Sequence, residues 1–189
     1  MTDVIQVDMQ RSGKRFEAEA VLELAADAQT VWDTITDYAA LPRFMPGIRA
    51  CRVTGRETLA DGSERVQVEQ QGEFRFLLFA QTMRVWLDIE HQPLRLAHAR
   101  ATRCELGLLR QRAIEVFEGR YELVSAPPRR GRGARTADTS AAPAPTTTLR
   151  YTALIGLALP PPPAIGNVAV RQNLTAQLEA LVAEIGRRS

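Results

Sequence analysis

The sequence contains few of the residues that usually build metal sites, disulfides or hydrolytic centres. Its 189 residues include two cysteines and two histidines, and these four lack the short paired spacing of a zinc site. Two distant cysteines predict no disulfide framework, which favours a reducing compartment. With so little histidine the sequence does not support a Ser–His–Asp hydrolase. We therefore expect neither a metal nor a cofactor, and no catalytic residue stands out.

Long apolar runs and an excess of charge are also missing. No stretch approaches 18 consecutive apolar residues, so we expect no transmembrane segment. Residues 1–19 lack the apolar run of a signal peptide, and the default prediction is a cytoplasmic protein. The formal net charge is +2, from 24 basic and 22 acidic residues, which argues against a DNA-binding protein.

Length and composition favour one globular domain. Hydrophobic residues make up 45% of the chain and charged residues 24%, which is typical of folded proteins. We expect a flexible polar tail over residues 1–14 and a single domain over residues 15–189. Within it, residues 126–145 lack periodicity and bulky apolar side chains, so this insertion is predicted to be disordered. It carries four arginines against one aspartate, a net charge of +3 that leaves the rest of the chain at −1.

Alternating apolar residues predict an extended sheet. Strict alternation over residues 15–24 is typical of a half-buried strand. The same reasoning, with turn residues between the segments, predicts six more strands. They cover residues 48–56, 64–75, 80–90, 94–102, 114–125 and 146–159.

Helical spacing occurs in two places. Asp27 is a candidate N-cap for a helix that contains Val31, Trp32 and Ile35, and a second short helix is predicted over residues 38–44. Four prolines end the last strand, and the chain then predicts one amphipathic helix. This helix covers residues 164–188. Its apolar stripe is formed by Leu174, Leu178, Leu181, Val182 and Ile185. At its C-terminal end, Arg187 and Arg188 are placed to complement the helix dipole.

Two segments carry a family resemblance. The run Ala28-Gln29-Thr30-Val31-Trp32-Asp33, followed by Asp37-Tyr38, Leu41-Pro42, Phe44 and Pro46-Gly47-Ile48, resembles the START-like polyketide cyclase and coenzyme-Q-binding family of the SRPBCC group. Residues 117–123 resemble the "GxW" strand of that family, with Tyr121 where tryptophan is usual. The resemblance implies an α+β helix-grip fold, in which a curved antiparallel β-sheet wraps around a long C-terminal α-helix. It also implies an internal cavity.

The alternation predicts which side chains face that cavity, although the same side chains could simply pack together as core. The apolar candidates on the inner face are Val66, Val68, Met83, Val85, Leu87, Leu96, Phe117, Tyr121, Leu123, Tyr151, Ala153, Ile155, Leu174 and Leu178.

The strand over residues 94–102 has two readings. Leu96, His98 and Arg100 share one face, and three alanines share the other. If Leu96 points inward, His98 and Arg100 join the ligand-binding residues, and the buried arginine needs Glu69 or a ligand anion as its partner. If the alanines point inward, His98 and Arg100 are solvated surface residues.

Two further features lie outside the predicted cavity lining. Arg84 and Trp86 lie opposite the apolar face of their strand, so we expect them on the outer face in a cation–π contact. The apolar run over residues 74–79 is either a doubly buried strand or an apolar edge that touches a membrane transiently or meets a partner.

The family includes lipid and quinone carriers, cyclase-type enzymes and a toxin-like branch reported to act on ribosomes. The leading prediction is a protein that binds or carries an apolar small molecule, of the lipid or prenylated quinone type, without covalent chemistry. One alternative is a cyclase/aromatase-type enzyme, with His98 as its acid–base group. The other is an interaction protein that uses the arginine-rich insertion to contact a protein, RNA or the ribosome.

Overall fold

Eight strands and three helices make up the described part of the chain. The computed structural model describes residues 5–76, 79–107, 114–124, 145–158 and 163–189. In chain order the elements are β1 (Asp8–Ser12), β2 (Arg15–Leu24), α1 (Ala28–Thr36), α2 (Leu41–Phe44), β3 (Ile48–Thr58), β4 (Glu64–Phe76), β5 (Phe79–Gln92), β6 (Leu96–Leu106), β7 (Ile114–Val124), β8 (Thr147–Leu157) and α3 (Pro163–Arg188).

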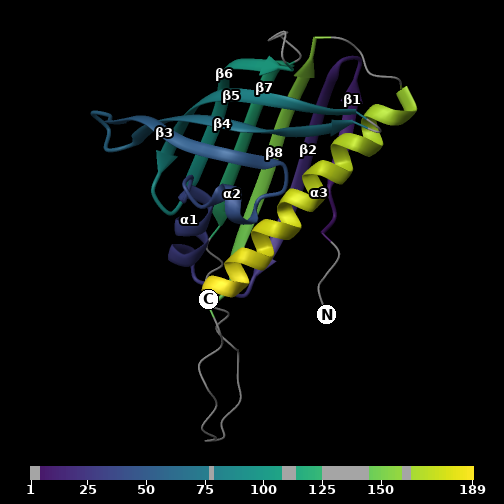
Figure 1. Ribbon diagram of the computed structural model, residues 1–189. Coiled ribbons are helices and arrows are strands. Elements are labelled where there is room, and N and C mark those ends of the chain that lie inside the picture. Colours follow the sequence, from purple (N-terminus) through teal and green to yellow (C-terminus); the bar gives the residue numbers. More distant parts are fainter. Residues whose placement is uncertain (1–4, 77–78, 108–113, 125–144, 159–162) are drawn as a thin grey trace, which may run out of the picture.

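All strands join one antiparallel sheet in the order β1-β2-β8-β7-β6-β5-β4-β3. Figure 1 shows that the sheet curves, that α3 lies across one face of it, and that α1 and α2 sit near the C-terminal end of α3. This is the helix-grip arrangement implied by the resemblance. The curvature leaves the inner face partly covered by α3, which is where a cavity can form.

The alternation in the sequence correctly predicts the buried face of β2. Every second residue is buried, from Phe16 at 1% exposed to Leu24 at 4%. The charged residues between them face outward. A strand with one apolar and one polar face needs a covered inner side, and the core beneath α3 provides it.

The predicted flexible tail over residues 1–14 is wrong for β1. Ser12 pairs with Arg15, and Gly13 adopts a φ of +60°, so residues 13 and 14 form a tight hairpin turn. Residues 8–12 are too polar to show apolar alternation, and backbone pairing to β2 is what holds them. Val7, just before the strand, is buried.

Asp27 caps α1 as predicted. Its Oδ1 accepts a hydrogen bond from the Thr30 backbone nitrogen at 2.9 Å, and its Oδ2 accepts one from Thr30 Oγ1 at 2.8 Å. These bonds favour the ionised carboxylate and lower the pKa of Asp27. The short helix that follows is α2, which is confined to four residues with Pro42 in its first turn. Tyr38 lies before it, in a turn that leaves its ring free to pack inward.

The C-terminal half of α3 is fixed against α1 and α2. Leu178, Leu181 and Ile185 are 1–2% exposed, as the predicted apolar stripe requires. Glu184 accepts hydrogen bonds from Arg187 and Arg188, which lower its pKa to about 2. Arg188 also donates to Asp37 Oδ2 at 3.1 Å, so the end of α3 is tied to the segment after α1.

Some predictions fall outside the described residues. Apart from its last residue, the insertion predicted over residues 126–145 lies there, and so do the side chains of the apolar run over residues 74–79. None of the helices that the structure describes is long and apolar enough to cross a membrane.

Candidate ligand-binding cavity

A cavity with two lobes lies between the sheet and α3. The first lobe, of about 220 Å³, is bounded by the inner face of β4–β8, the N-terminal half of α3 and the loop after α2. The second lobe, of about 120 Å³, lies toward α1 and α2. Each is far larger than the space that a single water molecule needs. The two lobes share six lining residues and so adjoin one another: Ile48, Gln70, Leu87, Phe117, Tyr151 and Gln177.

The first lobe opens to the surface beside the loop after α2. A surface hollow around residues 42–49 shares Pro46, Gly47, Glu73 and Asn173 with the first lobe, among other residues. The Glu73 backbone nitrogen donates to the Gly47 carbonyl at 2.8 Å, which fixes this loop on β4. The loop and α3 therefore form the rim between the lobe and the hollow, and this rim is the candidate entry for a ligand.

Eight of the predicted candidates line this cavity. They are Met83, Val85, Leu87, Phe117, Tyr121, Tyr151, Ile155 and Leu174.

The other buried candidates belong to the packed core rather than to the cavity wall. Val66, Val68 and Leu178 are 0–1% exposed, and Leu123 and Ala153 are 5–6% exposed, but none lines either lobe. Alternation identifies the face of a strand on which a residue lies. It does not show whether a neighbouring side chain fills the space in front of that residue.

The prediction that placed Leu96, His98 and Arg100 at the cavity is wrong. Ala97 and Ala99 line the second lobe instead, so the alanine face of β6 points inward. His98 Nε2 lies 3.4 Å from Glu118 Oε2, and Arg100 Nε lies 3.9 Å from the same atom, outside the cavity.

The rings on the neighbouring strands explain why alanine faces the cavity. Tyr121 of β7 and Tyr151 of β8 pack with their ring centroids 4.9 Å apart beside this part of β6. Only small side chains next to them leave the second lobe open. His98 is therefore not positioned to act as an acid–base group in the cavity.

A bulge in β6 explains why its pattern is hard to follow in the sequence. Trp86 of β5 pairs with Arg103, but the next residue, Leu87, pairs with Ala101. The extra residue, Thr102, returns Cys104 to the inner face, where it lines the first lobe. The strand continues past this bulge to Leu106, beyond the predicted end at residue 102.

The buried histidine is His91, which the sequence analysis did not select. It is 3% exposed, its Nε2 lies 2.6 Å from the Tyr38 hydroxyl, and its Nδ1 lies 3.4 Å from Glu64 Oε2. Trp32 of α1 packs edge-on against its ring. The inward-facing alternation of Val85, Leu87 and Ile89 extends to position 91, so this pattern could have indicated that His91 is buried.

His91 should make the protein less stable in mild acid. Burial lowers the pKa of His91 below its usual 6.5, and this outweighs the opposing effect of Glu64. As the pH falls below that value, the unfolded chain binds a proton that the folded chain does not, so stability decreases. The charged groups facing the ring are Glu64 and Arg56.

Denaturant titrations between pH 7 and pH 5 would measure this effect. We expect a shallower fall in the free energy of unfolding for His91→Gln than for the wild type. Parallel curves for the wild type and His91→Gln would contradict the assignment.

The thiol of Cys104 and the phenols of Tyr121 and Tyr151 in the cavity wall are held in their neutral forms. Burial raises the pKa of Cys104 to about 11 and that of Tyr121 to about 12, and it raises the pKa of Tyr151 further. The described lining near neutral pH therefore consists of apolar side chains, phenols, a thiol and carboxamides. Glu73 is its one charged residue, and it pairs with Arg49 at 3.0 Å beside the opening.

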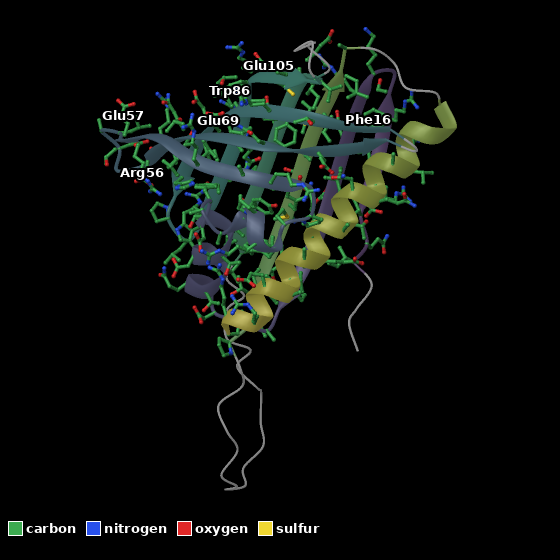
Figure 2. The ribbon with its side chains drawn as sticks, in the orientation of Figure 1. Phe16, Arg56, Glu57, Glu69, Trp86 and Glu105 are labelled. Atoms are coloured by element: carbon green, nitrogen blue, oxygen red, sulfur yellow. The ribbon has the colours of Figure 1, made fainter. Side chains whose placement is uncertain are left out.

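Arg84 and Trp86 lie on the outer face of the sheet in a cation–π contact, as predicted. The guanidinium groups of Arg84 and Arg103 lie 5.7 Å and 4.9 Å from the Trp86 ring centroid. Glu69 accepts a hydrogen bond from Arg52 at 2.6 Å and pairs with Arg84. Figure 2 shows Glu69, Trp86 and Glu105 near one another and away from α3. Glu69 thus pairs on the outer face and not with Arg100.

A family model described as polyketide cyclase / dehydrase and lipid transport matches residues 24–182. The chain belongs to this family. The matched range contains every strand of the cavity wall and most of α3, and the fold is that of a START-like protein. Compared with curated protein sequences, the chain has no significant match.

Several solved structures share this fold. A START superfamily protein from Mycobacterium smegmatis is 17% identical with a TM-score of 0.62, over 92% of this chain and 99% of that chain. The Zhui aromatase/cyclase from a Streptomyces species is 17% identical with a TM-score of 0.58, over 92% and 95%. A conserved protein from Geobacillus kaustophilus is 12% identical with a TM-score of 0.60, over 90% and 95%. At such identities the likeness establishes the fold alone.

Proposed function

We propose that this START-like protein binds and carries an apolar small molecule of the lipid or prenylated quinone type. The observation that carries the proposal is the two-lobed cavity, which opens beside the loop after α2 and is lined mainly by apolar and aromatic side chains. Transfer of an apolar ligand from water into such a site is favourable in proportion to the apolar area removed from water. The eight predicted residues that line the cavity would form the contact surface.

The chemistry of the lining supports carriage rather than catalysis. The buried phenols and the Cys104 thiol have raised pKa values, so they are poor proton donors and nucleophiles near neutral pH. The protein would shield its ligand from water without forming or breaking a bond.

Apolar compounds are expected to raise the melting temperature of the purified protein. A ligand that binds only the folded state, at a hundredfold excess over its Kd, stabilises it by about 2.7 kcal/mol. For a domain of this size that is a rise of roughly 5–10 °C. Thermal melts with a short-chain prenylated quinone and a monoacylglycerol should show the rise, and melts with nucleotides and sugars should not.

A variant that fills the cavity tests whether this shift comes from the proposed site. Val85 lines the first lobe and is 8% exposed, so Val85→Trp should occupy the ligand's space and abolish the shift. Val21 is 52% exposed on β2, and Val21→Trp should keep it. A shift that persists in Val85→Trp would place the ligand elsewhere, and no shift with any apolar compound would overturn the proposed function.

A further inference from the structure

Two carboxamides line the junction of the lobes. Gln70 of β4 and Gln177 of α3 each line both lobes, from opposite walls of the cavity. Gln177 Nε2 donates to Asn173 Oδ1 at 2.9 Å, which orients the side chain along α3. Gln70 lies opposite Cys51 of β3 in the strand pairing. Gln177 is thus held by a neighbour on its own helix, and Gln70 is placed by its strand.

The surroundings of these carboxamides are otherwise largely apolar. The remaining residues shared by the lobes are Ile48, Leu87, Phe117 and Tyr151. Apolar lining continues on either side, to Ile155 and Leu157 in the first lobe and to Ile89 and Leu181 in the second. The two carboxamides therefore stand at the middle of the cavity and not at one end.

We infer that the cavity selects an apolar molecule with one uncharged hydrogen-bonding group, such as an ester or a ketone, near its middle, and that Gln70 and Gln177 hold that group. This inference rests on the proposed function and specifies the ligand class. A carboxamide both donates and accepts, so the pair can satisfy a carbonyl or a hydroxyl oxygen. An apolar arm on each side of the group then fills one lobe.

A terminal carboxylate fits this site poorly. A buried anion needs a cationic partner or several donors, because removal of its hydration is costly. The charged group within the described lining is Glu73, which is already paired with Arg49, so the described lining itself offers a carboxylate no cationic partner. A polar atom of the ligand that lies against the apolar stretches of the lining would lose its hydrogen bonds to water without replacement.

Four probes of similar size separate these effects: hexyl hexanoate, methyl undecanoate, dodecanoate and dodecane. Their Kd values would be measured at pH 8 by displacement of a fluorescent apolar dye from the full chain. One net hydrogen bond corresponds to about a 2- to 10-fold change in Kd. We expect hexyl hexanoate to bind more tightly than methyl undecanoate by such a factor, and more tightly than dodecanoate by at least about tenfold.

Variants assign the preference to the two carboxamides. Gln70→Leu and Gln177→Leu should bind hexyl hexanoate no better than methyl undecanoate while still binding dodecane. Gln172, which is exposed on the same helix, supplies the control, and Gln172→Leu should keep the wild-type order. The wild-type comparison remains a test even if one variant fails to fold.

The outcomes distinguish this inference from the proposed function. The inference is wrong, and the carrier function stands, if dodecanoate binds the wild type as tightly as hexyl hexanoate does. The same holds if both leucine variants still bind hexyl hexanoate more tightly than methyl undecanoate. If none of the four probes displaces the dye, both are wrong.

Discussion

Leu178→Ala is expected to lower the free energy of unfolding by about 2–5 kcal/mol, the range for a leucine removed from a packed core. Leu178 is 1% exposed on the stripe of α3 that packs in the core, and it lines neither lobe of the cavity. The lost side chain would leave a void that its closely packed neighbours cannot fill. Denaturant titration of the variant and the wild type measures the difference.

Two other positions on α3 serve as controls for this experiment. Val168 is 54% exposed, so Val168→Ala should change stability by less than about 0.5 kcal/mol. Leu174 already borders open space, and Leu174→Ala should fall at the low end of the range for leucine. A cost below about 0.5 kcal/mol for Leu178→Ala would contradict the placement of α3 in the core.

Gly72→Ala is expected to destabilise the protein by about 3 kcal/mol, the upper end of the cost of overpacking. A Cβ at this position would overlap the Gly47 carbonyl oxygen. Gly47 has a φ of +82°, and its oxygen accepts a hydrogen bond from the Glu73 backbone nitrogen. The loop after α2 would have to move away from β4, which breaks this bond and widens the opening of the first lobe.

Two measurements separate the consequences of Gly72→Ala. Denaturant titration gives the stability loss, and stopped-flow dye release should show faster ligand dissociation than in the wild type. At Gly186, in the last turn of α3, an added Cβ would meet nothing within 4 Å, so Gly186→Ala should be neutral or slightly stabilising. Wild-type stability and dissociation rate in Gly72→Ala would show that the loop does not depend on this contact.

Much of the fold could be predicted from local signals. The alternation in β2 and β8, the Asp27 cap and the apolar stripe of α3 each predicted an element and its buried face correctly. The residues that carry the family resemblance lie in α1, α2 and the loop after them, where the chain turns from strand to helix and back. These features depend on residues within a few positions of one another, so they can be recognised in the sequence without the tertiary structure.

The candidate site was predicted only in part, because two of its features are not local. The inner face of β6 had two readings in the sequence, and its bulge at Thr102 is defined by pairing with β5. Gln70 and Gln177 lie at the spacing of their apolar neighbours on β4 and α3. Nothing in either segment shows that the two face each other across one cavity.

By itself the sequence determined the family, the order of the elements and the face of most strands. Motifs, periodicity and helix caps each depend on residues that are close together in the sequence. Only the tertiary structure decided which inward residues pack and which border open space. It placed His91 in the interior and His98 outside, and it left Val66 in the core but Val85 at the cavity. The reason is physical: a side chain's face depends on its own strand or helix, whereas the space in front of it depends on how the sheet curves around α3.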